Sequence, residues 1–429
     1  MADLAKILPV LLKPDSARTV IRPFEVEDPS EFAVPGRSRA QRIVERIMGL
    51  SASEVKAELQ DMRQSLDERH PDVEPTLRRR FEELKGLTLD KATATPDQAL
   101  LIGAYFSEEF SFESAALFNP SVVRHPDQSG VAPGDTRLVL SLRGIGEGHV
   151  SSLTFRTGVW AADGSISIDT PGPSATGPIV ESEAMDNGER RVRLRCGGAR
   201  EISETVIFPF LPSQGRGIED VRLTEFTEDD GAVDYRGTFT AFSGEVVREV
   251  LLRTPDFREI EMRGVEGPYA RAKGMALFPR RIGGRYFMLG RQDNENLWLM
   301  SSDDFYAWDG GAKLLGPEAP WEFMQIGNCG SPIEIEEGWL VLTHGVGSVR
   351  NYSVGACLLD RDDPSKVLGR LKLPLLEPQD QSRDGYVPNV IYSCGGMVRG
   401  RTLLLPYGVA DNYCAFATVE LDGLVAAMA

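Results

Sequence analysis

The chain has 429 residues, of which 41% are hydrophobic, 8% aromatic and 26% charged. This composition excludes a disordered or fibrous protein, and the length suggests roughly two to three domains or one continuous propeller or barrel. The 47 Lys and Arg residues against 64 Asp and Glu residues give a net charge of −17, which opposes broad contact with nucleic acid or an anionic membrane.

The N-terminal segment and the cysteines bear on the cellular compartment. Met1–Lys6 carries an early acid and no small-residue cleavage site after an apolar core, and the apolar stretches are far shorter than the ~20 residues of a membrane span. We therefore expect a cytoplasmic protein. Because the cysteines are widely spread and form no Cys-x-x-Cys pair, we expect buried free thiols at Cys196, Cys329, Cys357, Cys394 and Cys414.

Four amphipathic helices are predicted in the first hundred or so residues. One begins at Ser38 and ends at Gly49, and the next follows the capping-box pattern Ser51-x-x-Glu54. A third begins near Pro75, and a fourth begins at Thr95-Pro96, where Thr is a good cap and Pro a good first helical residue. Such helices must bury an apolar stripe, so we expect them to pack on the rest of the chain or to form a contact between subunits of a homo-oligomer.

From about Phe112 onward the apolar residues alternate with a period of two, which indicates β-strands. Roughly 310 residues of short antiparallel strands are too many for one sandwich and favour a radially repeated sheet, a propeller of about five blades. The clearest predicted strands are Arg137–Leu142, Ser152–Phe155, Tyr235–Phe242, Tyr286–Leu289, Leu297–Met300, Trp339–Leu342 and Thr402–Leu405.

Several common catalytic motifs are absent from the sequence. The 4 histidines form no His-Glu-x-x-His pattern, so no metal site is expected. The chain has no Gly-x-Ser-x-Gly elbow and no Gly-Lys dipeptide, which excludes the Walker phosphate loop. Gly144-Ile-Gly146-Glu-Gly148 opens no helix, so a nicotinamide enzyme is not expected either.

Two adjacent carboxylates, Glu219 and Asp220, precede Arg222 at the start of a predicted strand. Alternation along a strand is expected to send the two carboxylates to opposite faces, so that one points into a site and the other anchors structure. A general acid needs a carboxyl kept protonated by an apolar or crowded setting. The alternative is an ordinary solvated turn.

Three residues with basic side chains, Lys273, Arg291 and His344, lie at the ends of neighbouring predicted strands. They are either exposed ion-pair partners and a structural histidine, or together a cradle for an oxyanion in an otherwise acidic protein. Asp411 follows another apolar strand and is either a turn former or an acceptor for a sugar hydroxyl.

Taken as a set, the motifs resemble glycoside hydrolase family 130, which contains β-mannoside phosphorylases and some β-mannosidases. The resemblance covers about Phe112 to Val425. It rests on Asn119-Pro120, Ser141-Leu-Arg143, Gly217-Ile-Glu-Asp-Val-Arg222, Tyr235-x-x-Thr-x-Thr-Ala241, Leu277-Phe-Pro279, Ser301-Ser-Asp-Asp-Phe-Tyr-Ala-Trp308, Ile326-Gly327, Gly338-Trp-Leu340, His344-Gly-Val346, Leu358-Leu-Asp360, Asp363-Pro364, Gly385-Tyr-Val-Pro-Asn-Val390 and Tyr407-Gly-x-x-Asp411.

The resemblance implies a mainly β chain, with a helical N-terminal extension at residues 1–110 and a five-bladed β-propeller at residues 111–429. It also implies an inverting single displacement that needs no covalent sugar–enzyme intermediate. The general acid is then Asp220, which protonates the leaving oxygen through a sugar hydroxyl. The nucleophile is inorganic phosphate in the phosphorylases, which yield α-mannose 1-phosphate, and water in the hydrolases. No cofactor is implied, since phosphate is a co-substrate.

Carried over by motif, the resemblance implies mannosyl contacts in the −1 subsite and a separate group of residues that face the phosphate. The mannosyl contacts are Asn119, Arg143 and Asp411, and the phosphate-facing residues are Lys273, Arg291, His344 and Tyr352. Glu147 and His149 lie in a polar segment after Arg143 and are candidates for acceptor-sugar binding or for the base of a hydrolase. The alternative is a Gly-rich connection whose polar groups satisfy backbone.

Two positions depart from the family's phosphorylases and leave the activity open. This chain has Gln325 where they commonly have Lys, and Gly274 where they usually have Asp or Asn. Loss of one cation removes a charge-assisted contact of about 1.5 to 3 kcal/mol and weakens phosphate binding by roughly one to two orders of magnitude. A β-mannoside phosphorylase is therefore expected first, a β-mannosidase on the same scaffold second, and a non-catalytic mannoside-binding propeller third.

Overall fold

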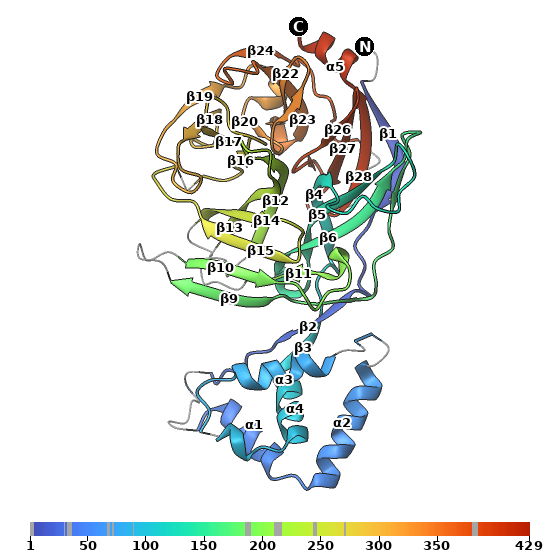
Figure 1. Cartoon of the computed structure of the whole chain (residues 1–429), viewed down its shortest axis with the longest axis vertical. Coiled ribbons are helices and arrows are strands. Elements are labelled where there is room, and N and C mark those ends of the chain that lie inside the picture. The colour runs from blue at the N-terminus through green and yellow to red at the C-terminus, as the bar shows by residue number, and fades with distance from the viewer. Residues whose placement is uncertain are drawn as a thin grey trace. The chain divides into compact units, whose positions relative to one another are not determined.

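The computed structural model describes the chain except for residues 1–3, 30, 32–36, 67–68, 71–72, 89, 185–189, 210–216, 243–246, 270–271 and 380–384. The chain forms two compact units (Figure 1). The sheet unit comprises Met1–Ser16, Phe112–Gly172 and Pro178–Ala429, and the helical unit comprises Ala17–Ser111 and Pro173–Gly177. Met1–Lys6, the segment in which the sequence analysis finds no cleavage site, begins with three residues that lie outside the described part of the chain.

The helical unit has helices at all four predicted places. They are α1 (Arg39–Met48), α2 (Ala52–Leu66), α3 (Val73–Glu83) and α4 (Pro96–Tyr105). Thr95 and Gln98 form a reciprocal capping box at α4, as expected for Thr before Pro at a helix start. The apolar faces of these helices meet in one core that includes Val44, Leu59 and Leu77.

The helical unit also contains a small sheet that the sequence analysis does not predict. Its strands are β2 (Thr19–Pro23), β3 (Ser107–Ser111) and β8 (Ser174–Ala175). β2 pairs with β3 antiparallel and with β8 in parallel. The segments are short and lack the alternation that indicates a strand, and each pairs with a partner that is distant in the sequence.

Within the described residues, the sheet unit is built from five sheets. The first contains β4 (Ala116–Arg124), β5 (Thr136–Ile145), β6 (Ser151–Trp160), β7 (Ile166–Ile168) and β11 (Val206–Ile207). The second contains β9 (Ile179–Ala184), β10 (Arg190–Arg195), β12 (Gly217–Thr227), β13 (Val233–Phe242), β14 (Val247–Thr254) and β15 (Glu259–Gly264).

Each of the three remaining sheets is drawn mainly from one continuous stretch of chain. The third contains β16 (Ala276–Leu277), β17 (Tyr286–Gly290), β18 (Leu297–Ser302) and β19 (Gly311–Leu315). The fourth contains β20 (Gln325–Asn328), β21 (Ile333–Ile335), β22 (Gly338–Val346), β23 (Tyr352–Leu359) and β24 (Val367–Arg370). The fifth contains β1 (Ala5–Leu12), β25 (Ile391–Tyr392), β26 (Met397–Arg399), β27 (Thr402–Val409) and β28 (Tyr413–Glu420).

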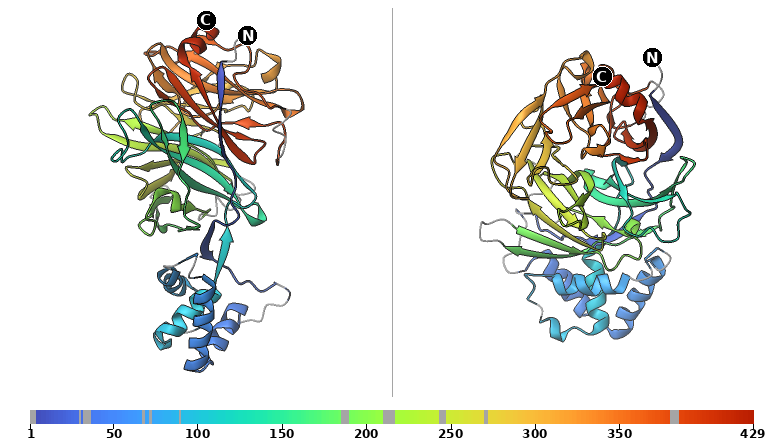
Figure 2. Two further views of the ribbon diagram at one scale, coloured as in Figure 1. Left: turned by 90° about the vertical axis from the view of Figure 1, so that its right-hand side faces the viewer. Right: turned by 45° about the horizontal axis from the view of Figure 1, so that its top comes forward.

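The five sheets close into a ring, because each sheet contacts the next in chain order and the last contacts the first. The contacts run from β4 to β12, from β13 to β16, from β18 to β20, from β23 to β25 and from β27 back to β4. Figure 1 shows this succession of sheets, with β4 and β12 near its middle, and Figure 2 shows it from two further directions. All seven strands named in the sequence analysis are present.

The first strand of the chain, β1, does not belong with the rest of the expected N-terminal extension. It pairs antiparallel with β28, so Ala5 to Leu12 belongs to the fifth sheet rather than to the helical unit. Pro9 lies where the pairing is irregular between Ile7 and Leu11, at the edge of that sheet, which is where a strand tolerates proline. The expected boundary between residues 110 and 111 therefore does not account for residues 1–16, which belong to the sheet unit.

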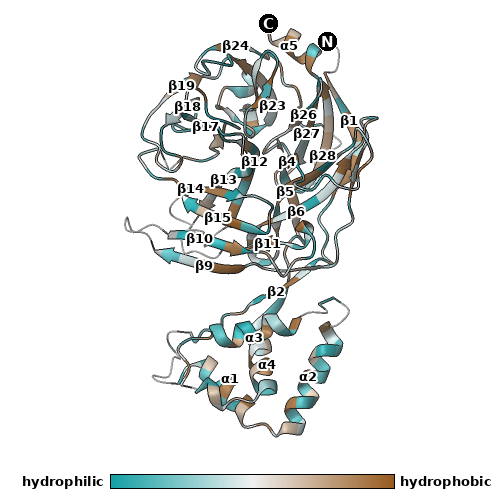
Figure 3. Ribbon diagram, in the orientation of Figure 1, coloured by the Kyte–Doolittle hydropathy of each residue, from teal (hydrophilic) through white to brown (hydrophobic). Residues whose placement is uncertain are grey.

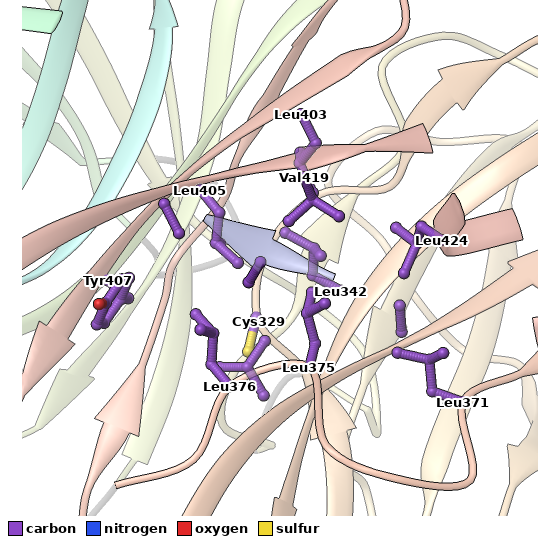
Figure 4. Close-up of a cluster of buried hydrophobic side chains, with 14 of the residues drawn as sticks. Cys329, Leu342, Leu371, Leu375, Leu376, Leu403, Leu405, Tyr407, Val419 and Leu424 are labelled. Atoms are coloured by element: carbon purple, nitrogen blue, oxygen red, sulfur yellow. The ribbon is translucent and has the colours of Figure 1, made fainter. Parts of the chain in front are cut away.

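The core of the sheet unit lies between neighbouring sheets. Figure 3 shows hydrophobic residues along the strands, as expected when both faces of a sheet are covered. In one cluster Cys329 lies among leucines of the fourth and fifth sheets, and α5 (Leu421–Met428) adds Leu424 to it (Figure 4). All five cysteines are free and buried, as predicted. In the described part of the chain, no helix is long and apolar enough to span a membrane.

Candidate active site

Four of the predicted site residues have a left-handed backbone, which is uncommon for residues other than glycine. The φ angles are 50° at Asn119, 58° at His149, 56° at Asp220 and 50° at Asp411. Strained backbone of this kind persists only where the surrounding structure holds it, and it occurs often at functional sites.

Asn119 and Asp220 lie at matching irregularities of two neighbouring strands. The pairing of β4 with β5 is interrupted at Asn119, and the pairing of β12 with β13 is interrupted at Asp220. A bulge of this type re-aims a side chain. As a result, Asn119 Nδ2 donates a hydrogen bond of 2.8 Å to Asp220 Oδ1, which joins two residues that are distant in the sequence.

Glu219 and Asp220 face the same cation. Arg143 lies 3.0 Å from Glu219 Oε1 through Nη2 and 3.5 Å from Asp220 Oδ1 through Nη1. Lys273 Nζ lies 3.4 Å from the other oxygen of Glu219. The expectation that strand alternation separates the two carboxylates is therefore wrong, because the bulge interrupts the alternation between them.

Asp220 is held in its ionised form. Burial raises the pKa of this carboxyl, but Arg143 and Arg222, the hydrogen bond from Asn119 and the charge of Lys273 together bring the pKa below its usual value. The carboxyl predicted as a proton donor is thus surrounded by cations in the free chain.

Asp411 lies in the turn between β27 and β28 and shares the electrostatic environment of Asp220. Burial, with a further contribution from the charge of Asp220, raises the pKa of Asp411 to about 6, although Arg143 opposes the shift. Gly408, three residues earlier, allows the close approach of this sheet to Asn119. A Cβ at Gly408 would lie 2.8 Å from Asn119 Oδ1.

Arg222 is the buried centre of the site, with an exposed fraction of 1%. Its Nη1 donates to the backbone carbonyl of Asp220 at 2.9 Å, and its Nη2 donates to the Tyr392 hydroxyl at 2.9 Å. The first bond holds the left-handed backbone of Asp220. Burial raises the pKa of the Tyr392 phenol, so Tyr392 remains neutral and accepts the bond.

Arg291 and His344 form a second group. Arg291 Nη1 lies 3.5 Å from His344 Nε2, and His344 Nδ1 lies 3.2 Å from the Asn328 carbonyl. Because a carbonyl only accepts, Nδ1 carries the ring proton and Nε2 is free to accept. Burial, reinforced by the charges of Arg291 and Arg222, holds the pKa of His344 well below its usual value. His344 is therefore a neutral imidazole rather than one of the cations of the predicted cradle.

Tyr352 and Gln325 border this second group. The Tyr352 ring stacks on the His344 ring with centroids 6.0 Å apart and planes 11° apart. Gln325 lies in β20, two residues before Gly327. A Cβ added at Gly327 would lie 2.5 Å from both Arg291 Cδ and His344 Cε1. Since side chains two apart on a strand share a face, Gln325 points to the side of Arg291 and His344.

Glu147 and His149 are exposed on a short 3-10 helix, η3 (Glu147–His149), that follows β5. The His149 ring lies edge-on to the Tyr386 ring, and the Tyr386 hydroxyl is 3.1 Å from His149 Nε2. The residue after Tyr386, Val387, donates to the Ala410 carbonyl, so Tyr386 lies beside the turn that carries Asp411. No hydrogen bond or ion pair of the Glu147 side chain is found in the described part of the chain.

The sequence analysis misses Glu249 and the roles of Tyr392 and Tyr386. Glu249 lies in β14 with no exposed surface, and its Oε2 accepts a hydrogen bond of 3.2 Å from Thr240 Oγ1. Its only sequence signal is a charged residue at a buried position of an apolar strand. Tyr392 and Tyr386 lie in or near a recognised motif, but their partners are distant in sequence and no spacing rule connects them.

Hydrogen bonds join the sheets just past Asn119 and Asp220. Ser121 Oγ accepts from Leu223 N at 3.1 Å, and Cys394 N donates to the Pro120 carbonyl at 2.9 Å. Further along β4 and β12 lies a cavity of about 220 Å³, lined by strand residues of the first, second, fourth and fifth sheets and by Pro279 after β16, and none of the predicted site residues lines it. The described residues contain no cluster of three or more His, Cys, Asp or Glu side chains suited to a metal ion.

Comparison with known proteins identifies mannoside phosphorylases as relatives of this chain. A family model described as beta-1,4-mannooligosaccharide phosphorylase, glycoside hydrolase family 130, matches residues 199–429. The chain is 34% identical over 227 residues to a beta-1,2-mannobiose phosphorylase of Listeria innocua, a match that covers 51% of this chain and 62% of the relative. It is 35% identical over 216 residues to a 1,2-beta-oligomannan phosphorylase of Thermoanaerobacter sp., covering 49% of this chain and 70% of the relative.

The structural comparison agrees with the sequence comparison. The solved structure of the beta-1,2-mannobiose phosphorylase from Listeria innocua, in complex with beta-1,2-mannobiose, matches with a TM-score of 0.51 and 26% identity. That match covers 74% of this chain and 93% of the solved chain. The matched family model includes the segments that carry Asp220, Lys273, Arg291, His344 and Asp411. The chain belongs to glycoside hydrolase family 130.

Proposed function

We propose that this chain is a β-mannoside phosphorylase, which cleaves a β-linked manno-oligosaccharide with inorganic phosphate and releases α-mannose 1-phosphate. The observation that carries the proposal is one site in which Arg222 donates to the backbone carbonyl of Asp220 and also flanks Gly274 together with Arg291. Phosphorolysis needs both parts, a proton donor for the leaving oxygen and cations for an attacking anion. The names of the relatives support the same reaction.

The proposed reaction is a single displacement with inversion. A phosphate oxygen attacks the anomeric carbon while the bond from that carbon to the leaving oxygen breaks, and the leaving oxygen receives a proton that originates on Asp220. The sugar is β-linked before the step and α-linked to phosphate after it. We further propose that the ring of five sheets is the five-bladed propeller that the family resemblance implies, with residues 111–429 and β1 carrying the activity.

The arrival of phosphate explains how an ionised Asp220 becomes an acid. Its pKa is lowered in the free chain by Arg143, Arg222 and Lys273. A phosphate dianion bound near these cations offsets their charge and raises the pKa of the carboxyl. Proton transfer is thereby favoured only when the nucleophile is in place.

The remaining predicted residues divide into two groups around this centre. Asn119, Arg143 and Asp411 are proposed to bind the mannosyl unit, because all three side chains gather at Asp220. Lys273, Arg291, His344 and Tyr352 are proposed to face the phosphate, with neutral His344 contributing a hydrogen-bonding ring rather than a charge. Glu147 and His149, together with Tyr386, are proposed to contact the acceptor sugar at the exposed rim.

The test is product analysis on a panel of β-1,2-, β-1,3- and β-1,4-linked manno-oligosaccharides with and without millimolar phosphate. We expect mannose 1-phosphate only when phosphate is present. Free mannose released at a rate independent of phosphate would replace the proposal with a β-mannosidase. Binding without turnover would replace it with a sugar-binding protein.

The proton donor is tested with Asp220→Asn, which we expect to lower kcat by about two to four orders of magnitude on natural oligosaccharides. Asp230→Asn is the matched control, since Asp230 is exposed in the turn that follows β12, at the other end of this strand from the bulge. Full activity of Asp220→Asn would exclude Asp220 as the acid.

A further inference from the structure

Two arginines share one buried position at the candidate phosphate site. A Cβ placed on Gly274 would lie 3.2 Å from Arg291 Nε and 3.4 Å from Arg222 Nη2, so the two guanidinium groups flank the same glycine. The Asn328 side chain donates to the Gly274 carbonyl at 2.9 Å and holds this segment in place. Two like charges so close together in a buried setting are costly unless an opposite charge accompanies them.

Among the described residues, the groups within hydrogen-bond distance of the two guanidinium groups are uncharged. Arg222 donates to a backbone carbonyl and to a phenol, and Arg291 lies against a neutral imidazole. The Nε atoms of both arginines have no hydrogen-bond partner within the described residues. Position 274 is a glycine and supplies no compensating side chain.

Glu249 is the buried acid that responds to both arginines. It lies in β14 opposite Thr240 of β13, which in turn pairs with Glu219 of β12 beside Asp220. It has no exposed surface, and one of its oxygens is bound to Thr240. Its other oxygen, Oε1, has no hydrogen-bond partner among the described residues. Burial raises the pKa of Glu249 to about 8, while Arg222 and Arg291 oppose the shift and Asp220 adds to it. These groups come from β12 and from the segment after β17, and each acts on Glu249 through its charge.

We propose that Glu249 is the proton switch of the anion site: ionised, it balances Arg222 and Arg291, and it takes up one proton when a phosphate dianion binds beside them. The proton comes from solvent and forms the carboxylic acid, with no other bond made or broken. The full charge of both arginines is then available to the phosphate. This inference rests on the proposed function, because phosphate is the anion that the switch serves.

The consequence is a phosphate affinity that falls in alkaline solution. Above its pKa, each further pH unit lowers the protonated fraction of Glu249 about tenfold. Protonating Glu249 then costs free energy, and this cost weakens the binding of phosphate. Glu249→Gln mimics the protonated acid and removes this cost. Glu249 contacts neither sugar nor phosphate in this account and is a positioning residue that acts through the arginines.

The experiment is calorimetric titration of the full chain with inorganic phosphate at pH 8, in two buffers that differ in heat of ionisation. At this pH phosphate is already mostly dianionic, so its own proton release is small. We expect wild type to take up about half a proton more per phosphate than Glu249→Gln, a difference in which any proton taken up by Asp220 cancels. Glu259→Gln is the matched control, because Glu259 is exposed on the neighbouring strand β15.

A second measurement compares the phosphate Kd of wild type and Glu249→Gln from pH 7 to pH 9. The ratio of wild-type to variant Kd is expected to rise about tenfold over this range, since phosphate's own ionisation cancels in the ratio. A constant ratio would overturn the proposal while leaving phosphate binding intact. So would the absence of proton uptake by wild type, a result that needs no folded variant. If wild type binds no phosphate at all, the proposed function fails together with the switch.

Discussion

Asp220 illustrates how one set of side chains serves two opposed requirements. Arg143, Arg222 and Lys273 keep the Asp220 carboxyl ionised. In the proposed reaction Arg222 and Lys273 also lie at the phosphate site, so this carboxyl becomes an acid only after the anion has entered. At the residue scale, the chemistry of the site is therefore coupled to what is bound in it.

Gln325→Lys tests the departure from the family pattern. A lysine here would point toward Arg291 and His344 and add one charge-assisted contact to phosphate, worth about 1.5 to 3 kcal/mol. We expect the KM for phosphate to fall by roughly one order of magnitude with little change in the KM for the oligosaccharide. Steady-state kinetics with phosphate as the varied substrate measures this.

The control for this prediction is Gln325→Met, which keeps the size of the side chain without adding charge. It is expected to leave the KM for phosphate close to that of wild type. An unchanged KM for phosphate in Gln325→Lys would show that position 325 does not face the anion.

At the scale of elements, strand irregularities and close contacts between sheets place the side chains. β20 passes so close to Arg291 and His344 that position 327 has no room for a side chain. The turn between β27 and β28 brings Asp411 to the same centre, and Gly408 lets that hairpin approach Asn119. Regular strands alone would leave these groups on separate faces.

Gly327→Ala is expected to separate Arg291 from His344. The new Cβ would lie 2.5 Å from a carbon of each, and overpacking of this kind typically costs about 1 to 3 kcal/mol. We expect a higher KM for phosphate and a lower melting temperature, measured by kinetics and thermal unfolding. Gly310→Ala should change neither, because nothing lies within 4 Å of a Cβ there.

The turn that carries Asp411 makes stability depend on pH. The pKa of Asp411 is about 6 in the folded chain, above its ordinary value of 3.8, because burial disfavours the charged form. The folded state therefore holds this proton more tightly, and the stability that it contributes is full at low pH and is lost as pH rises through about 6. Asp411→Asn, which cannot ionise, removes this loss.

Urea unfolding at pH 5 and pH 8 measures the effect. Relative to wild type, Asp411→Asn is expected to be more stable at pH 8 than at pH 5 by about 1 kcal/mol. Asp230→Asn serves as the exposed control and should show no such difference. An equal effect of Asp411→Asn at both pH values would contradict the buried setting of Asp411.

On the scale of the whole molecule, the first strand of the chain completes the last sheet. β1 pairs with β28 although the two lie at opposite ends of the sequence, and Ala5 is buried in a core that also contains Leu403 and Val419. The ring of sheets is thus closed by residues from both termini. Stability of the site depends on this closure because the fifth sheet carries Asp411.

Ala5→Asp is expected to weaken the closure. It places an unpaired charge in an apolar core, which typically costs a few kcal/mol, whereas Lys6→Asp changes the neighbouring exposed position. Thermal unfolding should show a clearly lower melting temperature for Ala5→Asp and a small change for Lys6→Asp. Similar melting temperatures for the two variants would mean that β1 adds little to the sheet unit.

Patterns along the chain are sufficient to predict the four helices, seven of the strands and the family. Three of the helices have local caps at Ser38, Ser51 and Thr95, all four bury apolar residues in one core, and the predicted strands have a period of two, so these elements follow from neighbouring residues. The motifs around Asp220, His344 and Asp411 indicate the family from the sequence alone, because they stand at characteristic spacings along the chain.

Which charges meet depends instead on tertiary contacts. The shared face of Glu219 and Asp220 depends on a bulge, and the neutral state of His344 depends on burial beside two arginines. In the sequence Glu249 is marked only as a charged residue within an apolar strand, and its protonation depends on charges contributed by other segments. Electrostatic energies depend on the distances between charges and on their burial, and the order of residues along the chain does not specify either quantity.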